Sequence, residues 1–130
     1  REMSMELPVP GILESPFGVF ESKIFSYKKQ KIEEKKYTKW FDYDKIKNSP
    51  CVRTRRQGDY LTVNSEGGRK KLNRIFIDEK IPAEMRDRLP VVAAGSEILW
   101  IPGGRMNEKY KITSTTGRVL ELHYQGGALA

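Results

Sequence analysis

Apolar and polar residues alternate over residues 37–43 of this 130-residue chain with the period of two that is typical of β-strands, and residues 90–94 and 97–101 form short apolar runs. Residues 18–28 are also rich in the β-branched and aromatic types that strands favour. The pattern predicts strands over residues 18–28, 37–43, 51–56, 60–63, 90–94, 97–101, 109–113 and 118–124. Gly95-Ser96 is expected to join two of them as a two-residue hairpin, and residues 60–63 are expected to pair back onto 51–56.

Two stretches in the middle of the chain have helical features instead. Apolar residues between Lys70 and Glu79 recur at the spacing of one helical face, and Pro82 suits the first turn of a second helix over residues 82–88. Prolines and glycines interrupt residues 1–18, which predicts an extended, loop-like lead-in. The charged residues 28–36 are expected to form a loop, with a short helix as the alternative.

These elements predict an α+β fold that is mainly β, a layered antiparallel or mixed sheet with two short helices. The length and the mass of 15.0 kDa fit one domain over residues 1–130, with its core in residues 37–124. Apolar residues make up 38% of the chain and charged residues 32%, which allows one modest core beneath a polar surface.

The net charge of +7 is concentrated in one short segment. Residues 53–74 hold 7 Lys and Arg against 2 Asp and Glu, whereas residues 75–130 hold 7 against 7. Such a surplus raises the local potential and favours a polyanionic partner such as nucleic acid. A solvated basic face without a partner is the alternative interpretation.

Several classes of protein are excluded or disfavoured by the composition. A chain with one cysteine and one histidine cannot form an internal disulfide or a zinc site of the usual Cys/His type. No apolar stretch approaches the roughly 20 residues that cross a bilayer, and no signal peptide is recognisable, so we expect a cytoplasmic protein. The start at Arg1 suggests a fragment of a longer chain.

No catalytic residues and no metal ligands are predicted. The sequence contains no GxSxG or HExxH motif and no neighbouring Cys–His pair. Asp42 and Asp44 would face the same side of a strand, but solvent-facing carboxylates explain them equally well. A small standalone enzyme remains the weakest of the alternatives.

Three arginines are the first candidates for RNA contacts. On a strand over residues 51–56, Arg53 and Arg55 would share one face about 7 Å apart, a spacing close to that of successive phosphates, and Arg56 would face the other side. Guanidinium groups suit bidentate phosphate recognition. Alternatively, one of the three pairs with Asp59 and fixes the following turn; we expect one to be structural and one or two to contact RNA.

A glycine-rich basic run is the second candidate. Gly67 and Gly68 would lie ahead of the predicted helix, where free backbone N–H groups favour anions, so a phosphate cradle and a plain flexible turn are both open. The candidate RNA-binding cations beyond the three arginines are Arg69, Lys70, Lys71, Lys80, Arg86 and Arg105. Tyr60 is a candidate for stacking on a base or ribose, whereas Trp100 is expected in the core.

From Arg53 onward the sequence also carries a set of ordered motifs. They read RxRRxGD at residues 53–59, KKL at 70–72, DEKIP at 78–82, RDRLP at 86–90 and ILWIPGGR at 98–105. This order and spacing resemble the C-terminal domain of tRNA(Ile)-lysidine synthetases. The resemblance covers about half of the chain and is weak over the first 35 residues.

The resemblance implies a function and a set of partners. The family's full enzyme is a ligase that uses ATP, with Mg²⁺, to join lysine to the wobble cytidine of tRNA(Ile). Its ATP site, an SGGxDS loop, belongs to an N-terminal PP-loop domain and is absent from this sequence, so no cofactor is expected on this chain. The implied role is to hold tRNA(Ile), at its acceptor stem, through a layered fold similar to one in phenylalanyl-tRNA synthetase β chains. The alternatives are a domain that docks on its own catalytic domain without touching RNA, or one that forms a homodimer.

Overall fold

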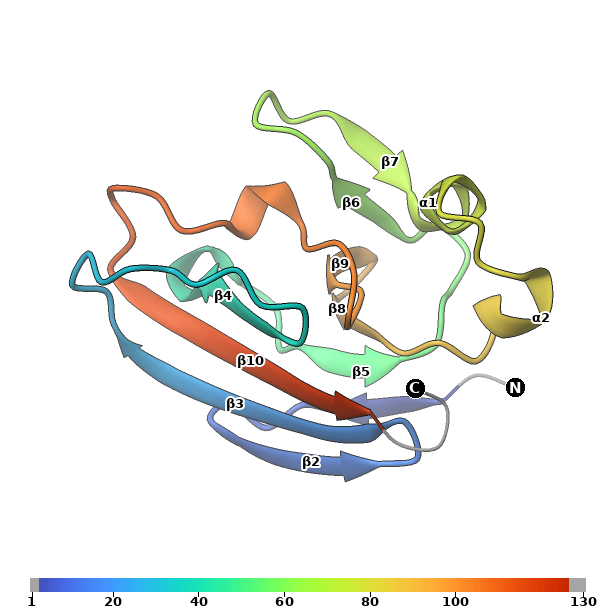
Figure 1. Ribbon diagram of the computed structural model, residues 1–130, viewed down its shortest axis with the longest axis horizontal. Helices are drawn as coiled ribbons and strands as arrows, with labels where there is room; N and C mark the ends of the chain where they lie inside the picture. Colours follow the sequence, from blue (N-terminus) through green and yellow to red (C-terminus); the bar gives the residue numbers. More distant parts are fainter. Residues whose placement is uncertain (1–2, 127–130) are drawn as a thin grey trace.

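The computed structural model describes residues 3–126, which form two β-sheets and two short α-helices (Figure 1). The first sheet has four antiparallel strands in the order β2-β3-β10-β4. Their bounds are Gly11–Ser15 for β2, Gly18–Ser26 for β3, Thr38–Asp42 for β4 and Arg118–Gly126 for β10. The nine-residue strands β3 and β10 pair along their full length and form the long axis of this sheet.

The second sheet has six short strands in the order β1-β5-β8-β9-β6-β7. Their bounds are Ser4–Glu6 for β1, Cys51–Arg53 for β5, Tyr60–Thr62 for β6, Arg69–Lys71 for β7, Val91–Ala94 for β8 and Glu97–Trp100 for β9. All pairs are antiparallel except β6 with β9, so this sheet is mixed.

Helical segments connect or follow these strands. Helix α1 (Leu72–Asp78) begins directly after β7, and α2 (Ala83–Arg86) follows Pro82. Two single turns of 3-10 helix, η1 (Tyr43–Lys45) and η2 (Glu108–Tyr110), lie in the connections before β5 and β10. None of the helices in the described part of the chain is long and apolar enough to cross a membrane.

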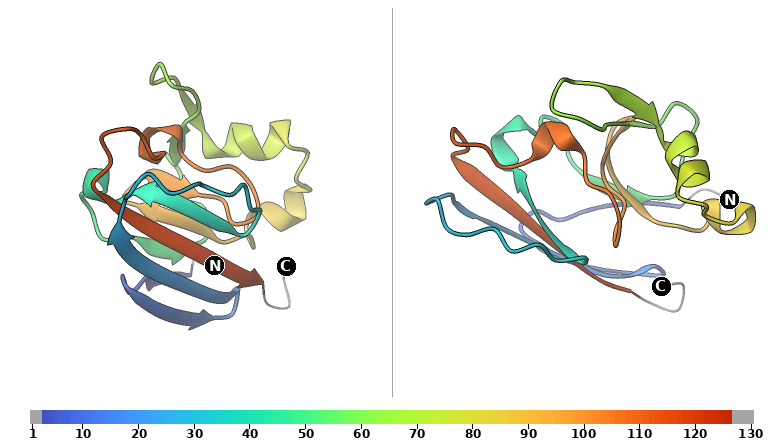
Figure 2. Two further views of the ribbon diagram at one scale, coloured as in Figure 1. Left: turned by 60° about the vertical axis from the view of Figure 1, so that its left-hand side comes forward. Right: turned by 45° about the horizontal axis from the view of Figure 1, so that its top comes forward.

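The two sheets and α1 form three layers, whose backbone Figure 2 shows from two sides, and a hydrophobic cluster lies between each pair of neighbouring layers. The first cluster lies between the sheets, where Phe20 and Leu120 of one sheet meet Val92 and Trp100 of the other. The second lies between the six-stranded sheet and α1 and includes Phe76. Strand β8 is buried on both faces because its alternate residues enter different clusters.

This architecture confirms the expected mainly β, layered fold with two short helices. The hairpin around Gly95-Ser96, the loop over residues 28–36 and the core position of Trp100 are also confirmed. The helical face predicted between Lys70 and Glu79 is buried at three of its four positions, whereas Glu79 is exposed.

Four expectations about single elements were wrong. Residues 1–18 contain strands β1 and β2, and Leu7 and Phe17 enter the core between the sheets. The strand predicted over 51–56 ends at Arg53. Strand β6 pairs with β9 and β7 rather than with β5, because β8 and β9 come between them in the sheet.

The fourth concerns residues 109–113, which were predicted as a strand. They begin in the 3-10 turn η2, and the side chain of Asn107 explains why. Its carbonyl oxygen accepts a hydrogen bond from Lys109 N, which caps the turn, while its amide donates to Ile98 O. An Asn that is fully buried and bonded on both sides fixes a turn where the apolar pattern alone favoured a strand.

Candidate nucleic-acid interface

Arg53 is the structural arginine of the three. It lies at the end of β5 with no exposed surface, and its Nη1 and Nη2 donate to the two carboxylate oxygens of Asp59, each at 2.8 Å. It also donates to the carbonyl oxygens of Thr54, at 3.0 Å, and Gly95, at 2.9 Å. The expectation that one arginine pairs with Asp59 is thus confirmed, and the assignment of Arg53 as an RNA contact is corrected, because the group is buried.

The Arg53–Asp59 pair organises the segment between the two residues. Asp59 accepts a hydrogen bond from Arg56 N at 2.7 Å, and its backbone carbonyl accepts one from Leu72 N, the first residue of α1. Gly58 completes the turn with a φ of 92°, in the left-handed region that favours glycine. The buried ion pair therefore joins β5, this turn, the β8–β9 hairpin and the start of α1.

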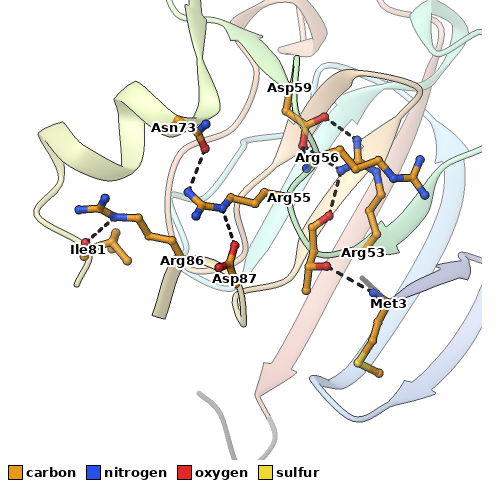
Figure 3. A network of polar contacts seen from close by, with 10 residues as sticks. Met3, Arg53, Arg55, Arg56, Asp59, Asn73, Ile81, Arg86 and Asp87 are labelled. Carbon is orange, nitrogen blue, oxygen red and sulfur yellow. Dashed lines mark hydrogen bonds and ion pairs between the residues drawn. The ribbon is translucent and has the colours of Figure 1, made fainter. Parts of the chain in front are cut away.

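Arg55 and Arg56 lie outside this buried pair, on the turn that it holds (Figure 3). Arg55 Nε donates to Asp87 Oδ1 at 2.8 Å and its Nη1 donates to Asn73 Oδ1 at 3.0 Å. Arg56 is exposed. The predicted strand face shared by Arg53 and Arg55 does not exist, since the chain leaves the sheet after Arg53.

The β6–β7 hairpin supplies a second group of cations. The guanidinium of Arg69 lies 4.7 Å from the centre of the Tyr60 ring, a cation–π contact, and Lys71 is the register partner of Tyr60. Arg69 and Lys71 are exposed, and Lys71 makes no ion pair within residues 3–126. Tyr60 is half-buried beneath Arg69, and its stacking on a base or ribose stays a prediction.

The glycine-rich run does not form the predicted cradle at a helix N-terminus. Gly67 and Gly68 lie in the turn between β6 and β7, and the three residues of β7 separate them from α1. The Asn64 side chain accepts from the backbone N–H groups of Glu66 and Gly68, so the turn satisfies its own donors. Of the two interpretations, the plain turn is the one that the structure supports.

Lys70 and Arg86 have internal partners. Lys70 Nζ lies 2.5 Å from Asp78 Oδ2, and this hydrogen bond holds the pKa of the Asp78 carboxyl below its usual value. Arg86 Nε donates to Ile81 O at 2.9 Å. Asp87, the next residue in the chain, bonds to Arg55 and not to Arg86.

Lys80 and Arg105 are exposed, and their side chains make no polar contact within the described residues. Lys80 has a φ of 57° and ends α1 in the way a glycine commonly does. Its own N–H donates to Ile77 O, and the next N–H, of Ile81, donates to Phe76 O. A lysine in this conformation carries backbone strain that a glycine would avoid.

Sequence reasoning missed Asn73 and the Arg55 contact of Asp87. Both residues bond to Arg55 from positions 18 and 32 residues away along the chain, so no local pattern indicates the contacts.

Within residues 3–126 no three His, Cys, Asp or Glu side chains gather in a way that would hold a metal ion. Asp42 is buried against Thr116, and Asp44 pairs with Arg118, so the two carboxylates face different partners.

Comparison with known proteins gives a consistent result. A family model described as "TilS substrate C-terminal domain" matches residues 51–122. The tRNA(Ile)-lysidine synthase of Caldanaerobacter subterraneus subsp. tengcongensis is 50% identical over 88 residues, which are 68% of this chain and 19% of that protein. The tRNA(Ile)-lysidine synthase of Geobacillus kaustophilus is 38% identical over 123 residues, 92% of this chain and 26% of that protein.

The fold comparison agrees with the sequence comparison. A crystal structure of a TilS C-terminal domain superimposes with a TM-score of 0.80 and 33% identity, covering 97% of this chain and 98% of that one. The chain spans about a fifth to a quarter of the length of the relatives named above. This chain belongs to the TilS C-terminal domain family.

Proposed function

We propose that this chain is the tRNA-binding C-terminal domain of a tRNA(Ile)-lysidine synthetase. The observation that carries the proposal is the turn over residues 54–59. A buried ion pair fixes this turn from within, while Arg55 and Arg56 lie on its outer side. Rigid presentation lowers the entropy that must be lost when a side chain is ordered on a phosphate.

The neighbouring cations extend this surface. The exposed hairpin residues Arg69 and Lys71 precede α1, which begins beside the turn, and the exposed Lys80 follows the helix. Double-stranded RNA is recognised mainly through its shape, its phosphates and its 2′-hydroxyls. Cations spread over a turn, a hairpin and a helix end suit that mode better than a deep pocket would, and the acceptor stem is the tRNA segment we propose as the ligand.

The chemistry of the parent enzyme would lie in another part of its chain. The relatives are roughly three and a half times as long as this chain and are named as synthases. We infer that a PP-loop domain of the parent enzyme binds ATP with Mg²⁺ and the lysine. The C-terminal domain described here would hold tRNA(Ile) for that PP-loop domain, in the cytoplasm. We place the ATP site in the PP-loop domain because these 130 residues contain no SGGxDS motif.

A double variant tests which arginines bind RNA. Replacing Arg55 and Arg56 by Ala, with Arg53 retained, should weaken tRNA binding by roughly tenfold or more, since each charge-assisted contact is worth about 1.5–3 kcal/mol. The matched control replaces Lys23 and Arg118, two exposed cations of the four-stranded sheet, and should change binding little. If both double variants weaken binding equally, the effect is one of net charge and the assigned surface is wrong.

The docking alternative predicts different behaviour. If the basic surface serves contact with a second copy, the purified chain should self-associate, and if it serves contact with the catalytic domain, the purified chain should stay monomeric. In both cases tRNA should not change its hydrodynamic size. Size measurements with and without tRNA, at several salt concentrations, distinguish this alternative from RNA binding.

A further inference from the structure

Arg55 is held by side chains from two separate helical segments (Figure 3). Asn73, in the first turn of α1, accepts from Nη1, and Asp87, which follows the last residue of α2, accepts from Nε. These contacts use two of the five N–H donors of the guanidinium group. No described residue forms a hydrogen bond with Nη2, and the Arg55 side chain is 25% exposed.

The Asp87 contact adds little to folding stability. The Asp87 side chain is 76% exposed and that of Arg55 is 25% exposed. Ion pairs in such surroundings are screened by solvent and contribute little to the free energy of unfolding. A carboxylate beside a phosphate-binding arginine would also repel RNA, so its presence there calls for a compensating role.

We propose that Asp87 is a positioning residue, which together with Asn73 orients Arg55 so that Nη2 points outward to an RNA phosphate. The proposal rests on the RNA-binding function proposed above. A hydrogen bond at Nε fixes the rotation of the guanidinium plane, and the bond at Nη1 fixes its tilt. The side chain then needs no further ordering when the phosphate arrives.

Two variants of equal charge separate positioning from simple repulsion. Asp87→Asn and Asp87→Ala both remove the negative charge, but only Asn keeps an oxygen that accepts from Arg55 Nε. We expect Asp87→Ala to weaken tRNA binding by about tenfold, the loss of one charge-assisted contact. Asp87→Asn should bind within about twofold of the unmodified chain. If both variants bind tRNA more tightly, Asp87 acts only by repulsion and the proposal is overturned.

Glu84 provides the matched control. It lies on α2, is exposed and forms no hydrogen bond or ion pair with Arg55, so Glu84→Ala removes the same charge nearby and should leave tRNA affinity unchanged or slightly higher. In a chain that already carries Arg55→Ala, adding Asp87→Ala should cause no further loss. A further loss there would show that Asp87 acts on the fold and not through Arg55. Thermal unfolding of each variant checks that it is folded.

A measurement without RNA keeps the two proposals distinguishable. In the NMR spectrum of the free chain, the Nε–H of Arg55 should exchange slowly with solvent, and Asp87→Ala should abolish that protection while Asp87→Asn retains part of it. Fast exchange in the unmodified chain would overturn the positioning role whatever the RNA result. Slow exchange in a chain that binds no tRNA would overturn the RNA-binding function, and with it the ligand proposed for Nη2.

Discussion

Arg53 and Asp59 show how two residues of one basic motif can have opposite exposure and opposite roles. The guanidinium of Arg53 is fully buried, and its two terminal nitrogens make four hydrogen bonds, whereas its buried Nε has no hydrogen-bond partner. Two residues further along, Arg55 is partly exposed and reaches side chains on the surface. Within one motif, Arg53 and Asp59 therefore stabilise the turn, and Arg55 is a side chain that the turn holds at the surface.

Removing Arg53 should lower the free energy of unfolding far more than removing Arg56. Arg53→Ala leaves the Asp59 carboxylate buried without its partner, which costs about 3–5 kcal/mol. Arg56→Ala, at an exposed position, should change the free energy of unfolding by only about 0.5 kcal/mol. Urea unfolding of both variants measures this. A loss below about 1 kcal/mol for Arg53→Ala would contradict a structural role for the pair.

Lys80 allows stability and binding to be separated at one position. With its φ of 57°, replacing Lys80 by Gly should relieve strain and stabilise the chain by about 1 kcal/mol. The same change removes an exposed cation and should weaken tRNA binding. Lys80→Ala removes the cation without relieving the strain, so it is the control in both thermal unfolding and tRNA titration. A Lys80→Gly variant that is less stable than the unmodified chain would refute the strain argument.

At the scale of elements, the turn of the β6–β7 hairpin was recognised from its residues, but strand β7 was not predicted and the turn was given the wrong role. The two glycines correctly indicated a turn, and the neighbouring basic residues suggested anion binding. Strand β7 was hidden because three consecutive basic residues, Arg69 to Lys71, have no apolar alternation of their own. The strand forms through its antiparallel pairing with β6, a contact that local propensity does not record.

A substitution in this turn should affect stability and not RNA binding. A Cβ added at Gly68 would lie 2.6 Å from Asn64 Nδ2, and moving Asn64 would break the hydrogen bonds that close the turn. We expect Gly68→Ala to lower the free energy of unfolding by about 1 kcal/mol. The tRNA affinity, measured well below the melting temperature, should be unchanged. A loss of tRNA affinity without a loss of stability would instead support a phosphate-binding role for Gly67 and Gly68.

At the scale of the whole molecule, the layered fold followed from the sequence more fully than its connections did. The apolar runs of β8 and β9 and the glycine between them predict a buried hairpin, and both strands lie in the middle layer. The lead-in was misjudged because Leu7 and Phe17 stand alone among prolines and glycines, and only the packed sheets give them partners. The similarity to phenylalanyl-tRNA synthetase β chains stays a prediction.

The candidate surface was predictable in position but not in detail. The charge surplus in residues 53–74 falls on the exposed turn and hairpin, whose contact with RNA stays a prediction, and the alternative that pairs an arginine with Asp59 is confirmed by the buried contact. Which arginine is buried depends on where β5 ends, and the Arg55–Asp87 contact depends on how α2 returns to the turn. Both are set by tertiary packing and not by local sequence.

A titration of tRNA into the chain across a range of salt concentrations tests RNA binding most directly. Each phosphate contact should contribute roughly −0.9 to the slope of log affinity against log salt on a duplex stem. With Arg55, Arg56 and the hairpin cations engaged, we expect a slope of roughly −2 to −4, which Arg55→Ala/Arg56→Ala should reduce by roughly two contacts' worth. A chain that is folded and binds tRNA undetectably, or with an affinity independent of salt, would contradict the proposed function.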